Sequence, residues 1–149
     1  MVDVRAGSWA SVTKVGHRVL GALDAAKIKV VLVTQASSEH SISVAIDESS
    51  GEAAVGALRA AFELELARGE ISSVKAHKGF SMFTVVGPMR AVKGTLKKLI
   101  DGVTKSGANI SAVAQGSSEQ SISVILSEDD LVPAMVVVHA EFLDGRGGV

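Results

Sequence analysis

Two glutamines carry the clearest chemical signal in this chain. Gln35 opens the stretch Gln-Ala-Ser-Ser-Glu-His-Ser-Ile-Ser-Val-Ala-Ile, and Gln115, 80 positions later, opens Gln-Gly-Ser-Ser-Glu-Gln-Ser-Ile-Ser-Val-Ile-Leu. Eight of the twelve positions are identical. A carboxamide both donates and accepts hydrogen bonds. The repeated glutamine therefore suits recognition of a polar small molecule more than the making or breaking of bonds.

The other reactive residue types do not form a catalytic set. The chain has no cysteine, no HExxH sequence and no glycine-rich phosphate loop. None of the histidines has a partner at metal-ligand spacing, and surface or packing roles are expected for all four, His17, His40, His77 and His139. We therefore expect no catalytic residue, no metal and no cofactor.

Composition narrows the possible partners. Among 149 residues, Lys plus Arg number 15 and Asp plus Glu 16, so no basic excess attracts nucleic acid or an anionic membrane. No apolar run approaches the ~20 residues that span a bilayer. The N-terminus has no signal-peptide pattern and is predicted to form a strand from its first residues, as expected of a piece of a longer chain. Neither nucleic acid nor a membrane is expected as a partner.

A fixed offset means that one structural unit is repeated. The offset of 80 extends upstream without a gap and aligns Gly7 with Gly87. Each repeat is predicted to begin with a strand, at residues 1–6 and 81–87. An amphipathic helix follows, because apolar residues recur at spacings of three and four, as in Val12, Val15, Val19 and Leu23.

Each glutamine is expected at the end of the next strand, residues 28–35 and 108–115. The strand after it alternates, with Ile42, Val44 and Ile46 on one face. A second helix completes each repeat, and residues 71–77 form a further strand in the first. The order predicts an α+β fold of tandem ferredoxin-like βαββαβ units, with antiparallel sheets and helices on one face. The expected units are residues 1–78 and 79–149.

The stretches QASSEHSI and QGSSEQSI resemble the regulatory region of aspartate kinases. The preceding segments agree, as do Phe62-Glu-Leu-Glu-Leu-Ala-Arg-Gly-Glu-Ile and His139-Ala-Glu-Phe. The resemblance covers nearly the whole chain, and the sequences of these segments are most similar to those of bifunctional aspartokinase–homoserine dehydrogenases. It implies tandem ACT domains that bind an amino acid, threonine first and lysine second. Such binding would mediate feedback inhibition of amino-acid biosynthesis.

The resemblance also implies the partners and the compartment. These are an amino-acid effector, a second copy that pairs ACT unit to ACT unit, and the kinase domain of a parent chain. The protein would be cytoplasmic, or plastid if the parent is from a plant or an alga. A strand from residues 140–145 would complete the first unit. The chain itself would be either an excised regulatory fragment or a free-standing ACT protein.

The expected effector site combines the glutamines with the loop that opens each first helix. Free N–H groups at a helix start suit an α-carboxylate. By resemblance, the strand preceding each glutamine also contributes its first residues, where Lys29 replaces the asparagine kept as Asn109. The expected contacts are Gly7, Ser8, Trp9, Ser11, Val12, Lys29, Val30, Gln35, Glu39, Met89, Val92, Asn109, Ile110, Gln115 and Glu119.

Alternatives remain for several of these residues. Trp9 either lines the pocket or fills a dimer interface. Glu39 and Glu119 either contact the ligand or only shape the Ser-Ser-Glu turn through side-chain to backbone bonds. The loops that open the first helix of each repeat lack the proline usual in the family. Lys29 also differs from the asparagine usual at its position. The competing hypothesis is therefore a dimerisation module whose effector sites do not function.

Overall fold

The structure is a computed structural model that describes residues 1–7, 12–36, 41–87, 94–116 and 120–144. The chain divides into two compact units, residues 1–78 and 79–149. Each unit has its own hydrophobic core.

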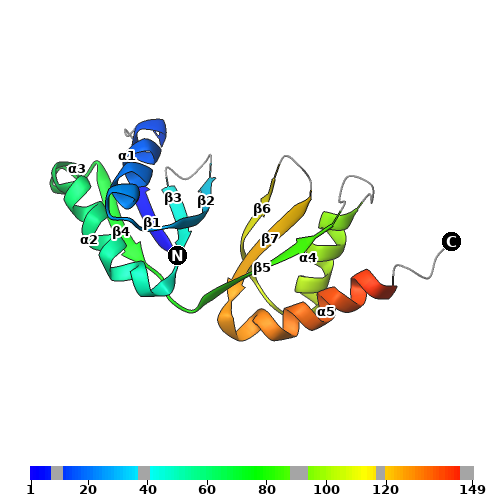
Figure 1. Ribbon diagram of the computed structural model, residues 1–149. Helices are drawn as coiled ribbons and strands as arrows, with labels where there is room; N and C mark the ends of the chain where they lie inside the picture. Colours follow the sequence, from blue (N-terminus) through cyan, green and yellow to red (C-terminus); the bar gives the residue numbers. More distant parts are fainter. Residues whose placement is uncertain (8–11, 37–40, 88–93, 117–119, 145–149) are drawn as a thin grey trace. The chain divides into compact units, whose positions relative to one another are not determined.

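The helices and strands alternate as the sequence patterns predict (Figure 1). The first unit contains β1 (Val2–Ala6), α1 (Val12–Ala25), β2 (Val30–Ala36), β3 (Ser41–Ile46), the 3-10 turn η1 (Glu48–Ser50), α2 (Gly51–Ala61), α3 (Glu63–Ala67) and β4 (Ile71–Ala76). The second contains β5 (Phe80–Val86), α4 (Thr95–Lys105), β6 (Ile110–Gln115), β7 (Ser121–Ser127), the 3-10 turn η3 (Glu128–Asp130) and α5 (Leu131–Asp144).

Both sheets are antiparallel and their helices cover one face (Figure 1). The first sheet has the order β2-β3-β1-β4, and the second has the order β5-β7-β6. The ferredoxin-like α+β prediction is confirmed. The two sheets match strand for strand, except that the described part of the second unit has no counterpart of β4.

The helices bury equivalent apolar stripes. Val19 and Leu23 of α1 are fully buried in the first core, and Leu99 and Val103 take their places in the second, 80 positions later. Burying such a side chain contributes about 1.5–3 kcal/mol. The 80-residue repeat is therefore a repeat of core positions.

The gapless alignment fails at the first strand, and the expected match of Gly7 with Gly87 is wrong. Val4 lies opposite Ile42, whereas Val85 lies opposite Ile122, so β5 follows β1 by 81 positions. A one-residue slip turns every side chain of a strand to the other face. Phe83 and Val85, and not Met82 and Thr84, consequently face the second core.

The predicted strand at residues 140–145 is also incorrect. Residues through Asp144 belong to α5, and Phe142 packs against the core of the second unit. The first sheet is completed by its own β4, which pairs with β1 from Val2↔Ala76 to Ala6↔Ile71. The apolar period of α5 continues to Phe142, which is why this segment stays helical.

Turn residues end the helices at matching places. Gly107 follows α4 with φ +84°, and Lys27 follows α1 with φ 59°. Glycine adopts this left-handed conformation without a steric penalty, whereas lysine pays one. Before α2, the Asp47 side chain caps the turn η1 by accepting a hydrogen bond from the Ser49 N–H at 2.9 Å. Ser50, at the start of α2, makes no side-chain capping bond.

Candidate functional site

The two glutamines occupy equivalent places in the two units. Gln35 lies one residue before the end of β2 and pairs with Ile42, and Gln115 ends β6 and pairs with Ile122. Both side chains are exposed. Their amide groups are therefore available to a ligand.

The end of β1 lies at the same end of the first sheet as Gln35. Ser41 pairs with both Arg5 of β1 and Ala36 of β2, which fixes the common end. Gly7 follows β1 directly, and α1 begins at Val12. The chain thus brings a glutamine amide and the end of β1 to one end of the sheet.

The second unit repeats this arrangement. Val86 pairs with Ser121 while Gln115 pairs with Ile122, so the end of β5 and the end of β6 also share one end of the sheet. The Gly87 N–H donates to the Gln120 carbonyl at 2.9 Å, which extends the pairing of β5 by one residue.

Gly7 has a structural reason to be glycine. Its N–H donates to the Glu70 carbonyl at 2.7 Å, and a Cβ at Gly7 would lie 3.0 Å from the Gly69 carbonyl oxygen. Because that neighbour is backbone, it cannot rotate away as a flexible side chain could. Close backbone approach therefore accounts for the residue type without a ligand.

The structure separates the remaining expected contacts from the glutamines. Lys29 and Val30 stand at the start of β2, and Asn109 and Ile110 at the start of β6. Six residues along a strand span about 20 Å at ~3.3 Å per residue. A free amino acid cannot reach both ends of one strand, so Lys29 and Gln35 cannot hold the same ligand molecule within one unit.

Several expected contacts lie outside the described residues, namely Ser8, Trp9, Ser11, Glu39, Met89, Val92 and Glu119. Within the described ranges, no group of three or more His, Cys, Asp or Glu side chains could hold a metal ion. No helix in the same ranges is long and apolar enough to cross a membrane.

An ion pair that the sequence patterns did not predict joins α1 to α3. The Arg18 guanidinium donates to both carboxylate oxygens of Glu65, to Oε2 at 3.2 Å, and also to the Ala61 carbonyl. It lies 4.4 Å from the centre of the Phe62 ring, which adds a cation–π contact. The two residues lie 47 positions apart in the chain, so no local sequence pattern pairs them.

This pair makes stability depend on pH. Its hydrogen bond lowers the pKa of Glu65 below the ordinary 4.5, so the contribution is present above that value and is lost as the pH falls through the lowered pKa. Because Arg18 is 40 % exposed, solvent screening limits the contribution of this ion pair to the free energy of unfolding to less than about 1 kcal/mol.

Arg18→Ala should lower the melting temperature at pH 7 and leave a smaller difference from the parent at pH 3. The exposed Arg59→Ala is the matched control, and an equal loss at both pH values would contradict the prediction.

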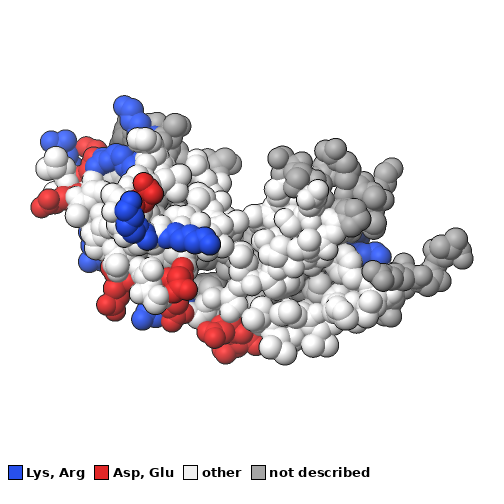
Figure 2. Space-filling view, in the orientation of Figure 1, with Lys and Arg blue, Asp and Glu red and all other residues white. Residues whose placement is uncertain are grey.

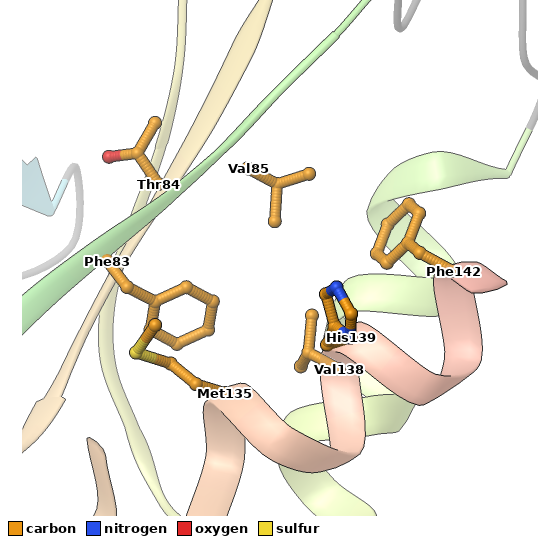
Figure 3. Close-up of a pocket in the computed structure, with 7 residues that line it drawn as sticks. All are labelled: Phe83, Thr84, Val85, Met135, Val138, His139 and Phe142. Atoms are coloured by element: carbon orange, nitrogen blue, oxygen red, sulfur yellow. The ribbon is translucent and has the colours of Figure 1, made fainter. Parts of the chain in front are cut away.

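An open apolar pocket lies on the opposite edge of the second sheet from Gln115. It has a volume of about 240 Å³ and is lined by β5 and α5, through Phe83, Thr84, Val85, Met135, Val138, His139 and Phe142 (Figure 3). Since β6 and β5 are the two outer strands, this pocket is separate from the glutamine end. One sequence signal could have indicated this pocket, namely the apolar residues on all sides of α5.

Comparison with known proteins gives a consistent result. The family model described as ACT domain matches residues 7–62 and 83–142. A chloroplastic bifunctional aspartokinase/homoserine dehydrogenase of Daucus carota is 34 % identical over 98 % of this chain, which covers 16 % of that protein. The corresponding protein of Haemophilus influenzae is 32 % identical over 100 % of this chain and 20 % of its own length.

The solved structures agree on the fold. The ligand-free regulatory subunit of aspartate kinase from Thermus thermophilus superimposes with a TM-score of 0.77 and 20 % identity, covering 94 % of this chain and 90 % of that one. The chain thus spans only about a fifth or less of the two bifunctional relatives but nearly all of a regulatory subunit. With two ferredoxin-like units and a family match in each, this chain belongs to the ACT domain family.

Proposed function

We propose that this chain is an allosteric regulatory module of an aspartate kinase, one that binds an amino acid and has no catalytic residues of its own. The observation that carries the proposal is the exposed glutamine repeated at the same end of each sheet, beside the end of the first strand. Threonine is the first candidate effector and lysine the second.

The chemistry of the glutamine end favours a zwitterion. The carboxamides of Gln35 and Gln115 can accept from an ammonium group and donate to a carboxylate. The start of α1 adds N–H groups without partners in the helix, which favour a carboxylate. The relatives' names support aspartate kinase as the regulated enzyme, and the chloroplastic relatives support a plastid as the compartment, with the cytoplasm as the other candidate.

Regulation requires two states with different affinities for the effector. We propose a homodimer formed by pairing of ACT units, in which the amino acid binds one dimer geometry better than another. The effector can shift the equilibrium only by that difference in affinity. Bound kinase substrate must in turn alter the affinity for the effector by the same factor.

Ligand-induced stabilisation tests the proposal. At 100 times its dissociation constant, a ligand of the folded state adds about 2.7 kcal/mol to the free energy of unfolding. We expect threonine, or failing that lysine, to raise the melting temperature by several degrees, and calorimetry to give the affinity. No shift with threonine, lysine or methionine at millimolar concentration would support the dimerisation module instead.

Substitutions then locate the bound effector. Gln35→Ala and Gln115→Ala, alone and together, should each weaken binding at the unit concerned by tenfold or more, the loss of one to two hydrogen bonds to a charged group. Asn109→Ala is the matched control at the opposite end of β6, about 20 Å away. Its affinity should equal the parent's, and a selective loss there would move the site to that end.

A further inference from the structure

The glutamine side chains lie on the helix-covered faces of the two sheets. Gln35 pairs with Ile42 and Gln115 pairs with Ile122, and both isoleucines are buried in the cores. Residues directly opposite one another on neighbouring strands share one face of the sheet. Side chains from the first helix of each unit can therefore reach the ligand that the glutamine binds.

Gly16 of α1 lies against Ile42. A Cβ built at Gly16 would be 3.3 Å from Ile42 Cδ1. Since the Cβ atoms of cross-strand partners are about 4.5–5.5 Å apart, only the width of one side chain separates Gly16 from Gln35. Glycine has no side chain, so α1 leaves the space beside Ile42 and Gln35 unfilled at this position.

Leu96 holds the equivalent position on α4. The buried positions of the two helices match at an offset of 80. Val15 and Thr95 are 6 % and 5 % exposed. One turn further along, Val19 and Leu99 are both fully buried. Leu96 itself is 38 % exposed, so its side chain lies at the surface of the second unit. The second unit thus carries a leucine side chain where the first unit carries none.

The two helix flanks differ in size and not in charge. One turn beyond Gly16 and Leu96, both helices carry an exposed apolar residue, Leu20 at 43 % and Ile100 at 38 %. Elsewhere the units differ in charge, since Figure 2 shows charged side chains over the visible face of the first unit and few over that of the second. A test of ligand size must therefore include both an uncharged and a cationic ligand.

We propose that Gly16 and Leu96 set the length of the amino-acid side chain that each glutamine end accepts. Beside Gln35, the missing side chain leaves space for a long effector side chain, such as that of methionine or lysine. Beside Gln115, the leucine takes up this space, and the end accepts a short side chain, such as that of threonine. This inference rests on the proposed binding of an amino acid at the glutamines.

The expected size of the effect follows from steric discrimination. One methylene group more or less in an apolar pocket changes specificity by about 10–200-fold. Leucine adds more than one such group to the space that glycine leaves. The preference for a long over a short ligand should therefore differ between the two ends by at least about tenfold.

Calorimetry on proteins that retain one intact glutamine end tests the proposal. Gln115→Ala leaves the first end intact, and Gln35→Ala leaves the second. Threonine, methionine and lysine are titrated into each protein. The length preference is the threonine dissociation constant divided by that of methionine, and we expect it to be at least about tenfold higher at the first end. Equal preferences at the two ends would overturn the proposal. So would tight binding of lysine with methionine no tighter than threonine, because charge and not length would then select the ligand.

Substitutions at the two helix positions assign the effect. In the protein with only the first end intact, Gly16→Leu should lower the length preference at least about tenfold. In the protein with only the second end intact, Leu96→Ala should raise it. The matched controls are Gly21→Leu, where nothing lies within 4 Å of an added Cβ, and Ile100→Ala on the exposed flank of α4. Both controls should leave the preference unchanged.

The Gly16→Leu protein is expected to fold, because the atom nearest to the added Cβ is the end of a flexible isoleucine side chain. Circular dichroism checks this, and Leu96→Ala tests the same idea without adding any atoms. Equal effects of Gly16→Leu and Gly21→Leu would overturn this inference and leave the proposed function standing. If none of the three amino acids bound the parent chain, both would be overturned.

Discussion

Phe62→Ala is expected to lower the free energy of unfolding of the first unit by about 3–5 kcal/mol. The ring is 1 % exposed, and Leu58 and Ile71 of the same core are also buried. Removing it costs both the transfer of the ring from water and the cavity left behind. The Arg18 guanidinium, 4.4 Å from the ring centre, would lose its aromatic contact as well.

Phe142→Ala is the matched variant, because Phe142 occupies the same position in the second unit. Phe142 borders an open pocket, so less of its surface is buried on folding. Solvent can also fill the space that the ring vacates. We expect a loss of about 1–2 kcal/mol. Urea denaturation combined with hydrogen exchange in each unit separates the two effects. Equal losses for the two variants would show that the pocket is closed in solution.

Gly102→Ala is expected to destabilise the second unit by about 1–3 kcal/mol. A Cβ at Gly102 would lie 2.9 Å from Val138 Cγ2 and 3.0 Å from Val138 Cα. The side chain could rotate, but the backbone contact forces α4 and α5 apart. The change in melting temperature is measured by thermal unfolding of the variant, monitored by circular dichroism.

Gly21→Ala is the control for this prediction. Gly21 lies within α1, and nothing lies within 4 Å of a Cβ built there. Alanine in a helix interior is favoured over glycine by about 0.5–1 kcal/mol, so this variant should be more stable than the parent. If Gly102→Ala also stabilised the protein, the close packing of α4 on α5 would be refuted.

Local patterns predicted most of the fold, and the first strand shows where they fail. The buried faces of α1 and α4 follow from one repeated apolar stripe, in which Val19 and Leu99 hold equivalent positions. The segment Met-Phe-Thr-Val-Val of β5 has apolar residues at both odd and even positions, so alternation cannot choose the buried face. The pairing of Val85 with Ile122 decides it, and that pairing depends on a strand 37 positions away.

The sequence by itself determined that a unit is repeated, the order of its helices and strands, and a glutamine at the end of one strand in each copy. Short-range periodicity encodes these features, because side-chain direction repeats with the helix or strand period. Only the tertiary structure decided that Arg18 meets Glu65, and that β5 is an outer strand in the described part of the second sheet. These depend on strand order and helix packing, which arise from many weak contacts between residues far apart in the chain.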